Sequence, residues 1–117
     1  MMKIMSYASA TPTKFENDQA KGVSGRVVIG KADGADHFCM RMFEVAPGGY
    51  SAKHTHAWEH EIFIHSGEGE MYGNGKWNSV KSGTVLFVPP NEEHQIRNTG
   101  KDLLIYACLI PADAPEL

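Results

Sequence analysis

The sequence has only two cysteines, and their placement argues against two common uses of this residue. Cys39 and Cys108 lie far apart and outside any C-x-x-C arrangement, which is unlike a zinc ribbon or a thioredoxin-type motif. Each cysteine lies within an apolar stretch. We therefore expect two buried free thiols, with a disulfide between them as the alternative.

The sequence also lacks a run of basic residues and a long apolar segment. Its eleven Lys and Arg residues are scattered and its net charge is −3, so we expect neither nucleic acid nor an anionic membrane surface as a partner. No stretch has the length of a transmembrane helix, and the N-terminal residues lack the apolar core of a signal peptide. Residence in the cytoplasm is expected by default.

What the sequence does contain predicts one all-β domain. Its 117 residues, 42% of them hydrophobic, are enough to bury a core without disulfide support. No stretch keeps a helical apolar period for three turns, whereas short apolar segments recur between Gly and Pro residues. This pattern is typical of a barrel or jelly roll.

Individual strands can be placed from the same pattern. Residues 14–22 are polar and are expected to form an arm or loop, and residues 46–49 are expected to break the strand before them. Residues 94–98 and 103–110 are expected to pair with each other. A tight hairpin is predicted at residues 73–75, because Gly-Asn-Gly supplies positive φ angles. The other expected strands are residues 26–30, 37–45, 61–66 and 84–88.

Histidines are concentrated where strand geometry would bring them together. His54 and His56 are two residues apart, so on a strand they project from the same face. His60 lies another even step along and can join them after a short bend, and His94 follows a Pro-Pro turn later in the chain. Imidazoles are ligands of transition metals. These four residues therefore predict a metal site.

The remaining histidines and the nearby acids have simpler interpretations. His37 and His65 are expected to be structural or exposed, since each differs from the four in phase or position. Glu59 and Glu61 are expected to be solvated or to orient imidazole N–H groups.

The same histidines carry a resemblance to the cupin superfamily, which covers residues 23–110 approximately. The second cupin motif, G-x5-P-x-G-x2-H-x3-N, differs in having Asn91 where the family has glycine. Asn tolerates left-handed backbone geometry. The first motif, G-x5-H-x-H-x3-E-x6-G, has histidine in place of its glutamate. The residues that match the two motifs are Gly48, His54, His56, Gly67, Gly83, Pro89, His94 and Asn98, with His60 at the glutamate position.

The histidine at position 60 decides which cupins the chain resembles. Glu61 is an alternative glutamate ligand, but its odd phase points it away from His54 and His56, so His60 is preferred. The sequence is similar to small bacterial single-domain cupins that hold manganese with four histidines.

This resemblance implies a double-stranded β-helix, or jelly-roll barrel, formed by a single domain over residues 1–117. It would have an N-terminal arm over residues 1–22, a first motif over 48–67 and a second over 83–98. The resemblance also implies a homodimer and one divalent ion per chain. Manganese is the expected metal, and Fe, Ni, Zn, Co and Cu are the alternatives, since imidazole alone does not select among them.

Further pocket residues follow from the resemblance, because the last strand of this fold passes the metal. Tyr106 and Cys108 share an inward phase on that strand and are candidates to line the pocket, with Tyr106 able to donate a proton. Core packing is the alternative for Cys108. Arg41 and Glu44 have opposite phases, so one of them at most faces inward. An inward Arg41 would anchor a substrate carboxylate.

Four neutral ligands leave the charge of a divalent ion uncompensated, which favours an anionic or chelating small-molecule substrate. The sequence therefore predicts a metal-dependent enzyme, with oxidoreductase chemistry of the dioxygenase type preferred. The alternatives are a lyase or isomerase acting on a small oxo- or hydroxy-acid, and a cupin that binds a small molecule without turnover.

Overall fold

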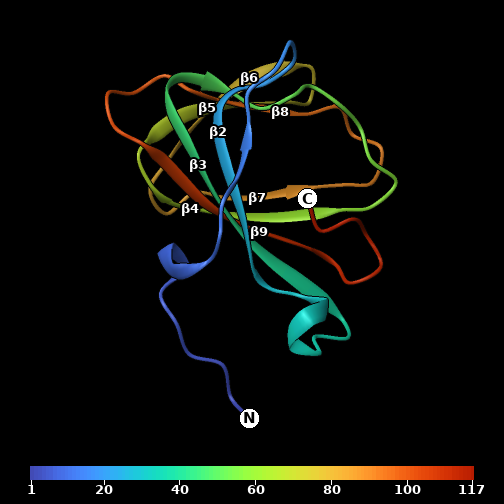
Figure 1. Ribbon diagram of the computed structural model, residues 1–117. Coiled ribbons are helices and arrows are strands. Elements are labelled where there is room, and N and C mark those ends of the chain that lie inside the picture. Colours follow the sequence, from blue (N-terminus) through green and yellow to red (C-terminus); the bar gives the residue numbers. More distant parts are fainter.

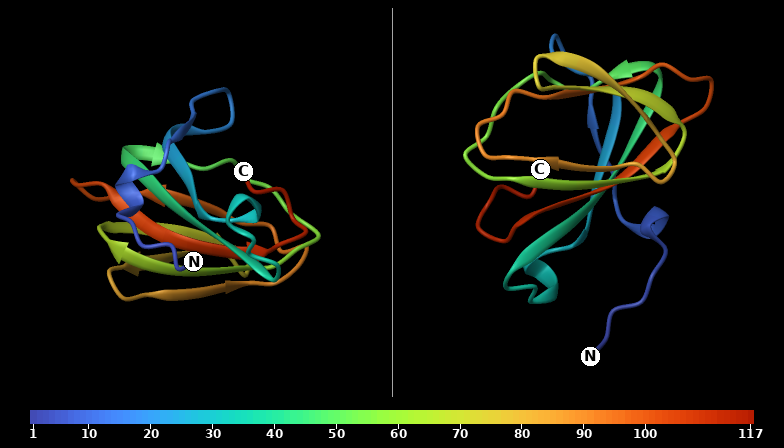
Figure 2. Two further views of the ribbon diagram at one scale, coloured as in Figure 1. Left: turned by 60° about the horizontal axis from the view of Figure 1, so that its bottom comes forward. Right: turned by 180° about the vertical axis from the view of Figure 1, so that it is seen from behind.

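The computed structural model describes all 117 residues and contains one curled sheet of nine strands. Figures 1 and 2 show the strands wrapped into an open barrel, with the first residues extending away from it. The strands are β1 (Thr13–Phe15), β2 (Lys21–Ile29), β3 (Phe38–Tyr50), β4 (His60–Ser66), β5 (Glu68–Gly73), β6 (Lys76–Lys81), β7 (Val85–Val88), β8 (Gln95–Asn98) and β9 (Leu104–Pro111). Two short 3-10 turns, η1 (Tyr7–Ser9) and η2 (Lys31–Asp33), complete the fold. The predicted all-β jelly-roll class is confirmed, and no helix is long and apolar enough to cross a membrane.

The long strand β3 organises the sheet, in the order β6-β5-β8-β3-β9-β4-β7 with β2 and then β1 on its other side. Its register pairs Arg41 with Cys108 of β9, and the alternation along the strand turns both side chains inward. Glu44 has the opposite phase and is bonded to Arg26 and Tyr7 on the outer side. β3 lies between β2 and β9 rather than at an edge of the sheet. The homodimer stays a prediction.

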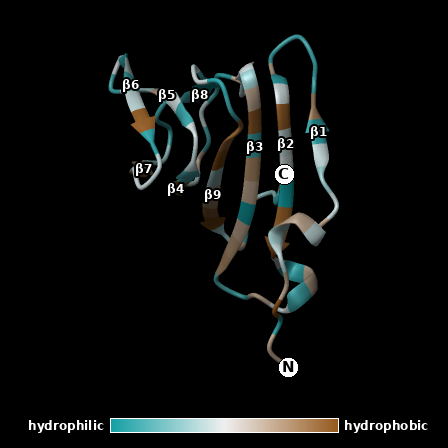
Figure 3. Cartoon of the chain, turned by 90° about the vertical axis from the view of Figure 1, so that its left-hand side faces the viewer, coloured by the Kyte–Doolittle hydropathy of each residue, from teal (hydrophilic) through white to brown (hydrophobic).

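The core lies between the inner faces of the strands. On β9 the four alternate residues Leu104, Tyr106, Cys108 and Ile110 are all buried, as their shared phase predicts. Figure 3 shows brown, apolar segments on β9 and β2, with teal residues in many of the connecting turns. Cys39 is equally buried, and both cysteines are free, which confirms the prediction of two buried thiols.

The structure corrects two strand boundaries near the N-terminal side of the sheet. The segment 14–22 is not a loop throughout, because β1 ends at Phe15 and β2 begins at Lys21. The residues 46–49 do not break β3, which continues to Tyr50. Gly22 and Gly48 adopt positive φ angles of 64° and 78° at a shift in the β2–β3 register. A bulge with glycine therefore lets pairing continue where the sequence predicts an end.

A third correction concerns strand pairing. The predicted pair of 94–98 with 103–110 does not form, because β8 pairs with β5 and β9 lies between β3 and β4. The side chain of Asn98 explains how the chain changes neighbours between them. It donates to the carbonyls of Val45 and Asp102 at 2.7 and 2.8 Å, and accepts from the N–H of Gly100 at 2.8 Å. These bonds hold the intervening turn against β3.

Turn residues behave as the sequence predicts. The β5–β6 hairpin closes through Asn74 and Gly75, with φ angles of 54° and 75°, and its register pairs Gly73 with Lys76. Asn91 has a φ of 66°, so it replaces a glycine of the cupin motif in the conformation that glycine would supply.

Two glycines with the same φ of 90° give a matched test of packing around the sheet. A Cβ on Gly67 would collide with the backbone carbonyl of Leu103, whereas a Cβ on Gly83 would meet open space. Gly83→Ala should cost about 1–3 kcal/mol of unfolding free energy from strained φ alone. Gly67→Ala should cost at least about 1 kcal/mol more, since backbone must move. Urea denaturation of the two variants measures the difference, and equal losses would contradict this packing argument.

Candidate metal centre

Four histidine rings converge inside the barrel. Two of them, His54 and His56, do not lie on a strand as the sequence predicted. Residues 51–59 form an irregular connection with one isolated bridge, in which His54 and His94 exchange backbone N–H to carbonyl bonds of 3.2 and 3.1 Å. The carbonyl of His56 accepts from the N–H of Asn91 at 2.6 Å. The rings converge because these bonds fasten the loop to the turn before β8, rather than through strand alternation.

The ring positions define a compact group. His54, His56 and His94 each offer a ligand atom, and these atoms all lie within 4.8 Å of one another. His60 is not in that set, but its ring centroid is 5.1 Å from that of His56 and 5.0 Å from that of His94. Three histidines are therefore close enough together to bind one metal ion, and the fourth borders them.

His60 lies on β4, where its inward phase agrees with the sequence, and its side chain is 5% exposed. Its Nδ1 is 3.4 Å from the sulfur of Cys108 and 3.3 Å from Nη2 of Arg41. Its Nε2 is buried and has no hydrogen-bond partner. A buried nitrogen without a partner is costly, and a metal ion beside His56 and His94 would satisfy it. The donor set therefore fits a divalent transition metal.

Two neighbouring contacts orient the other rings. Nδ1 of His94 lies 2.8 Å from the carbonyl oxygen of Glu92. Since a carbonyl only accepts, Nδ1 carries the hydrogen and the lone pair of Nε2 stays free for a metal. The indole of Trp58 stacks on His56, with ring centroids 4.6 Å apart and planes 8° from parallel. Both contacts restrict ring rotation before any metal binds.

Desolvation keeps three of the four imidazoles neutral. Desolvation lowers the pKa of His60 to about 3 and that of His56 to about 4, with the positive charge of Arg41 and the other histidines adding to the effect. Desolvation also lowers the pKa of His54. Only the neutral ring can donate a lone pair to a metal. Three of the four histidines are thus ready to bind one without losing a proton.

The histidines open into a cavity of about 360 Å³, a volume within the range of small-molecule sites. Twelve of its 21 lining residues are hydrophobic, and four of these are the aromatic residues Phe15, Phe43, Trp58 and Tyr106. Arg41, which is 8% exposed, is the only lysine, arginine or acidic side chain in the wall. The cavity therefore combines an apolar wall with a polar inner end.

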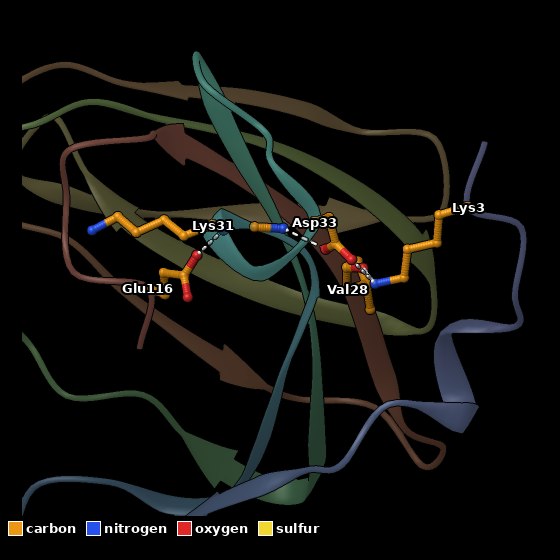
Figure 4. Close-up of polar contacts among 6 residues, drawn as sticks. Lys3, Val28, Lys31, Asp33 and Glu116 are labelled. Carbon is orange, nitrogen blue, oxygen red and sulfur yellow. Dashed lines mark hydrogen bonds and ion pairs between the residues drawn. The ribbon is translucent and has the colours of Figure 1, made fainter. Parts of the chain in front are cut away.

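The last residues of the chain close one side of this cavity. Pro115 and Leu117 contribute to its wall, and the intervening Glu116 fixes their position. Its carboxylate accepts from the backbone N–H of Lys31 at 2.8 Å, and its carbonyl accepts from Nη1 of Arg41 at 3.4 Å. Figure 4 shows the contact of Glu116 with Lys31 beside that of Asp33 with Lys3, which is 2.8 Å long. The turn η2 thus holds the tail against β3.

The structure places every sequence-predicted pocket residue on the cavity wall. Arg41, Tyr106 and Cys108 all line it, and burial raises the pKa values of Tyr106 and Cys108. His37, His65, Glu59 and Glu61 are exposed, as expected for residues outside the site. Sequence reasoning missed Phe15, Phe43 and Leu117. Phe43 shares the phase of Arg41 on β3, so the alternation that made Arg41 an inward candidate applies equally to Phe43. No pattern in the sequence indicates the tail.

The depressed pKa of His60 predicts how acid affects the metal-free protein. In the unfolded chain this imidazole titrates near 6.5, whereas in the folded protein it does so near 3. Above pH 6.5 the ring is neutral in both states and does not affect stability. Between about pH 6.5 and 3 only the unfolded state takes up the proton, so the unfolding free energy falls, by up to about 1.4 kcal/mol per pH unit.

Urea denaturation of metal-free parent and His60→Gln at pH 7.5, 5.5 and 4.5 measures this contribution. Other titrating groups, including the carboxylates, are common to both proteins, so the variant should lose stability less steeply. His65→Gln, at an exposed position, is the control and should follow the parent. Parallel curves for the parent and His60→Gln would show that folded His60 titrates normally.

Known proteins resemble this chain in both sequence and structure. The polyketide cyclase RemF from Streptomyces resistomycificus superposes with a TM-score of 0.89 at 29% identity, over 98% of this chain and 82% of that one. A predicted oxalate decarboxylase from Thermotoga maritima gives 0.82 at 29% identity, over 94% and 99% of the two chains. A glucose-6-phosphate isomerase from Thermococcus onnurineus is 38% identical over 78 residues, which is 62% of this chain and 40% of the isomerase.

The region shared with known proteins contains the four histidines and the strands around them. The family model described as a cupin domain matches residues 41–110, from inward-facing Arg41 on β3 to Ile110 on β9. This range includes the four converging histidines and more than half of the chain. The chain therefore belongs to the cupin domain family.

Proposed function

We propose that the protein is a metal-dependent enzyme that rearranges a small, largely apolar carbonyl compound by Lewis-acid chemistry. The observation that carries this proposal is the buried Nε2 of His60, which lacks a partner beside three clustered histidines at the inner end of an apolar cavity. Such a combination of metal ligands and an enclosed, mostly apolar wall is typical of an enzyme site.

The ligands of the ion would be His54, His56 and His94, with His60 as the fourth. All four are imidazoles, so the protein supplies no negative charge to the ion. When bound, a divalent ion would polarise a substrate oxygen and favour loss of a proton from the adjacent carbon. A chelating substrate with two oxygens would best complement an ion that keeps open positions.

Two residues of the wall have distinct roles. Tyr106 is buried and its pKa is raised by desolvation, so its hydroxyl stays protonated and would donate a hydrogen bond to a substrate oxygen. Arg41 places a positive charge beside His60 and disfavours protonation of that ring, so it helps to keep the imidazole neutral. Its Nε is buried without a hydrogen-bond partner.

The wall also argues against a sugar phosphate as the substrate. Relatives of this chain include a glucose-6-phosphate isomerase, but a phosphate dianion requires several donors or cations. Here Arg41 is the only cationic side chain in the wall, and its Nη2 already donates to Cys108 at 2.9 Å. The aromatic residues Phe15, Phe43 and Trp58 instead suit a planar, apolar substrate body.

The names of two relatives support Lewis-acid chemistry over oxidation. One is a polyketide cyclase and one an isomerase, and neither ring closure nor isomerisation requires an oxidant. The dioxygenase chemistry preferred from the sequence has no comparable support among them. It remains the second candidate, because imidazole ligands also hold redox-active Mn and Fe.

Metal content is the first test of the site. Untagged protein should contain close to one divalent ion per chain by elemental analysis, and His54→Ala, His56→Ala and His94→Ala should each lose most of it. His60→Ala should bind zinc more weakly than the parent in competition with a chelating dye. Glu61→Ala and His65→Ala, at exposed positions on the same strand, serve as controls. Loss of zinc from Glu61→Ala with tight binding by His60→Ala would refute the four-histidine set.

The reaction class can be tested with one panel of substrates and metals. Aryl-substituted 1,3-diketones, 2-oxo acids and glucose 6-phosphate are incubated with zinc and manganese forms, in air and under nitrogen, and products are identified by mass spectrometry. The proposal predicts conversion of an aryl diketone or oxo acid by the zinc form under nitrogen. Activity only in air with manganese would indicate an oxygenase. Conversion of glucose 6-phosphate would refute the substrate class, and no turnover by any form would favour a binding protein.

A further inference from the structure

One cysteine contacts the histidine at the motif position where most cupins have glutamate. Cys108 on β9 lies 2.9 Å from Nη2 of Arg41 and 3.4 Å from Nδ1 of His60. It is 2% exposed, so solvent does not compete for these contacts. The register places this sulfur between the side chains of Arg41 and His60. Cys108 pairs with Arg41 of β3 on one side, and on the other side with Ile62 of β4, which shares its phase with His60.

The contacts around His60 permit two arrangements of its single hydrogen. A neutral imidazole has one N–H and one lone pair, whereas an arginine side chain only donates. If Nδ1 accepts from Arg41, the hydrogen must be on Nε2, where the buried atom has no acceptor. If Nδ1 carries the hydrogen, it can donate to the sulfur of Cys108, and the lone pair of Nε2 is free. Only the second arrangement allows His60 to bind a metal through Nε2.

Arg41 therefore competes with the metal for the tautomer of His60. Its Nη2 is 3.3 Å from Nδ1, close enough to donate and so to force the hydrogen onto Nε2. Cys108 resolves this competition, because its sulfur can accept from both Arg41 and Nδ1. The shorter contact of Nη2, at 2.9 Å, is with the sulfur.

We propose that Cys108 is the positioning residue that keeps His60 in the metal-binding tautomer, by accepting the hydrogens of both Arg41 and Nδ1 of His60. This inference rests on the proposed function, because it requires a metal at the histidines. A glutamate at this motif position would bind the metal through a carboxylate, which has no tautomers to choose between. A histidine at that position needs an acceptor behind it.

The test uses zinc, which leaves the NMR spectrum of this 117-residue chain free of paramagnetic effects. Long-range ¹H–¹⁵N correlations of the imidazoles identify the tautomer of each ring, and His60→Gln assigns the signals of His60. In the zinc-loaded parent, His60 should carry its hydrogen on Nδ1. In Cys108→Ala the sulfur is gone, so Arg41 should donate to Nδ1 and the hydrogen should move to Nε2. Zinc affinity should fall about 10- to 100-fold.

Two variants separate this role from simple packing. Cys39→Ala removes the other free thiol, which is equally buried on the adjacent strand β3 but does not line the cavity, so it should change neither tautomer nor affinity. Cys108→Ser keeps an acceptor and should retain the Nδ1 hydrogen and most of the affinity.

The outcomes distinguish the inference from the function on which it rests. If the zinc-loaded parent has the His60 hydrogen on Nε2, or if Cys108→Ala keeps it on Nδ1 with unchanged affinity, the role of Cys108 is refuted while the metal site stands. A parent that binds no zinc refutes both. Equal losses of affinity in Cys39→Ala and Cys108→Ala would show that the effect is one of packing.

Discussion

The antiparallel pairing of β3 with β9 is the constraint on which the site depends. It sets Arg41 opposite Cys108, and β4 on the far side of β9 brings His60 to the same sulfur. A shift of one residue in this register would turn the inner side chains of β9 outward. The buried row from Leu104 to Ile110 prevents such a shift, because it would expose the core. Packing and chemistry are thus fixed by the same pairing.

The histidines show how much of the site the sequence could predict. His60 follows strand alternation with Ile62 and Ile64, so its inward direction was predictable from the period of two. His54 and His56 also converge, but the predicted strand was wrong. They are held by the bridge to His94, a contact between segments forty residues apart in the sequence. The spacing of the motif residues is compatible with the bridge between His54 and His94, but it does not show that the bridge forms.

Features that depend on distant pairing could not be predicted in the same way. The expected pairing of 94–98 with 103–110 followed from their closeness in sequence, whereas the buried Asn98 fastens the turn to β3 and separates the two strands. The extension of β3 through Pro47 depends on a glycine bulge whose partner, Gly22, is on another strand. The contact of Arg41 with Cys108 and His60 joins three strands, and no local pattern in the sequence indicates it.

The stacking of Trp58 on His56 gives the protein an optical property. The chain has two tryptophans, and the second lies outside the cavity, on β6, against Tyr72 and beneath the guanidinium of Arg97. An excited indole can donate an electron to an imidazole stacked on it, and does so more readily when a proton or a metal ion withdraws charge from that ring. The emission of Trp58 should therefore depend on the state of the histidine centre, whereas Trp77 contacts Tyr72 and Arg97 instead of these rings.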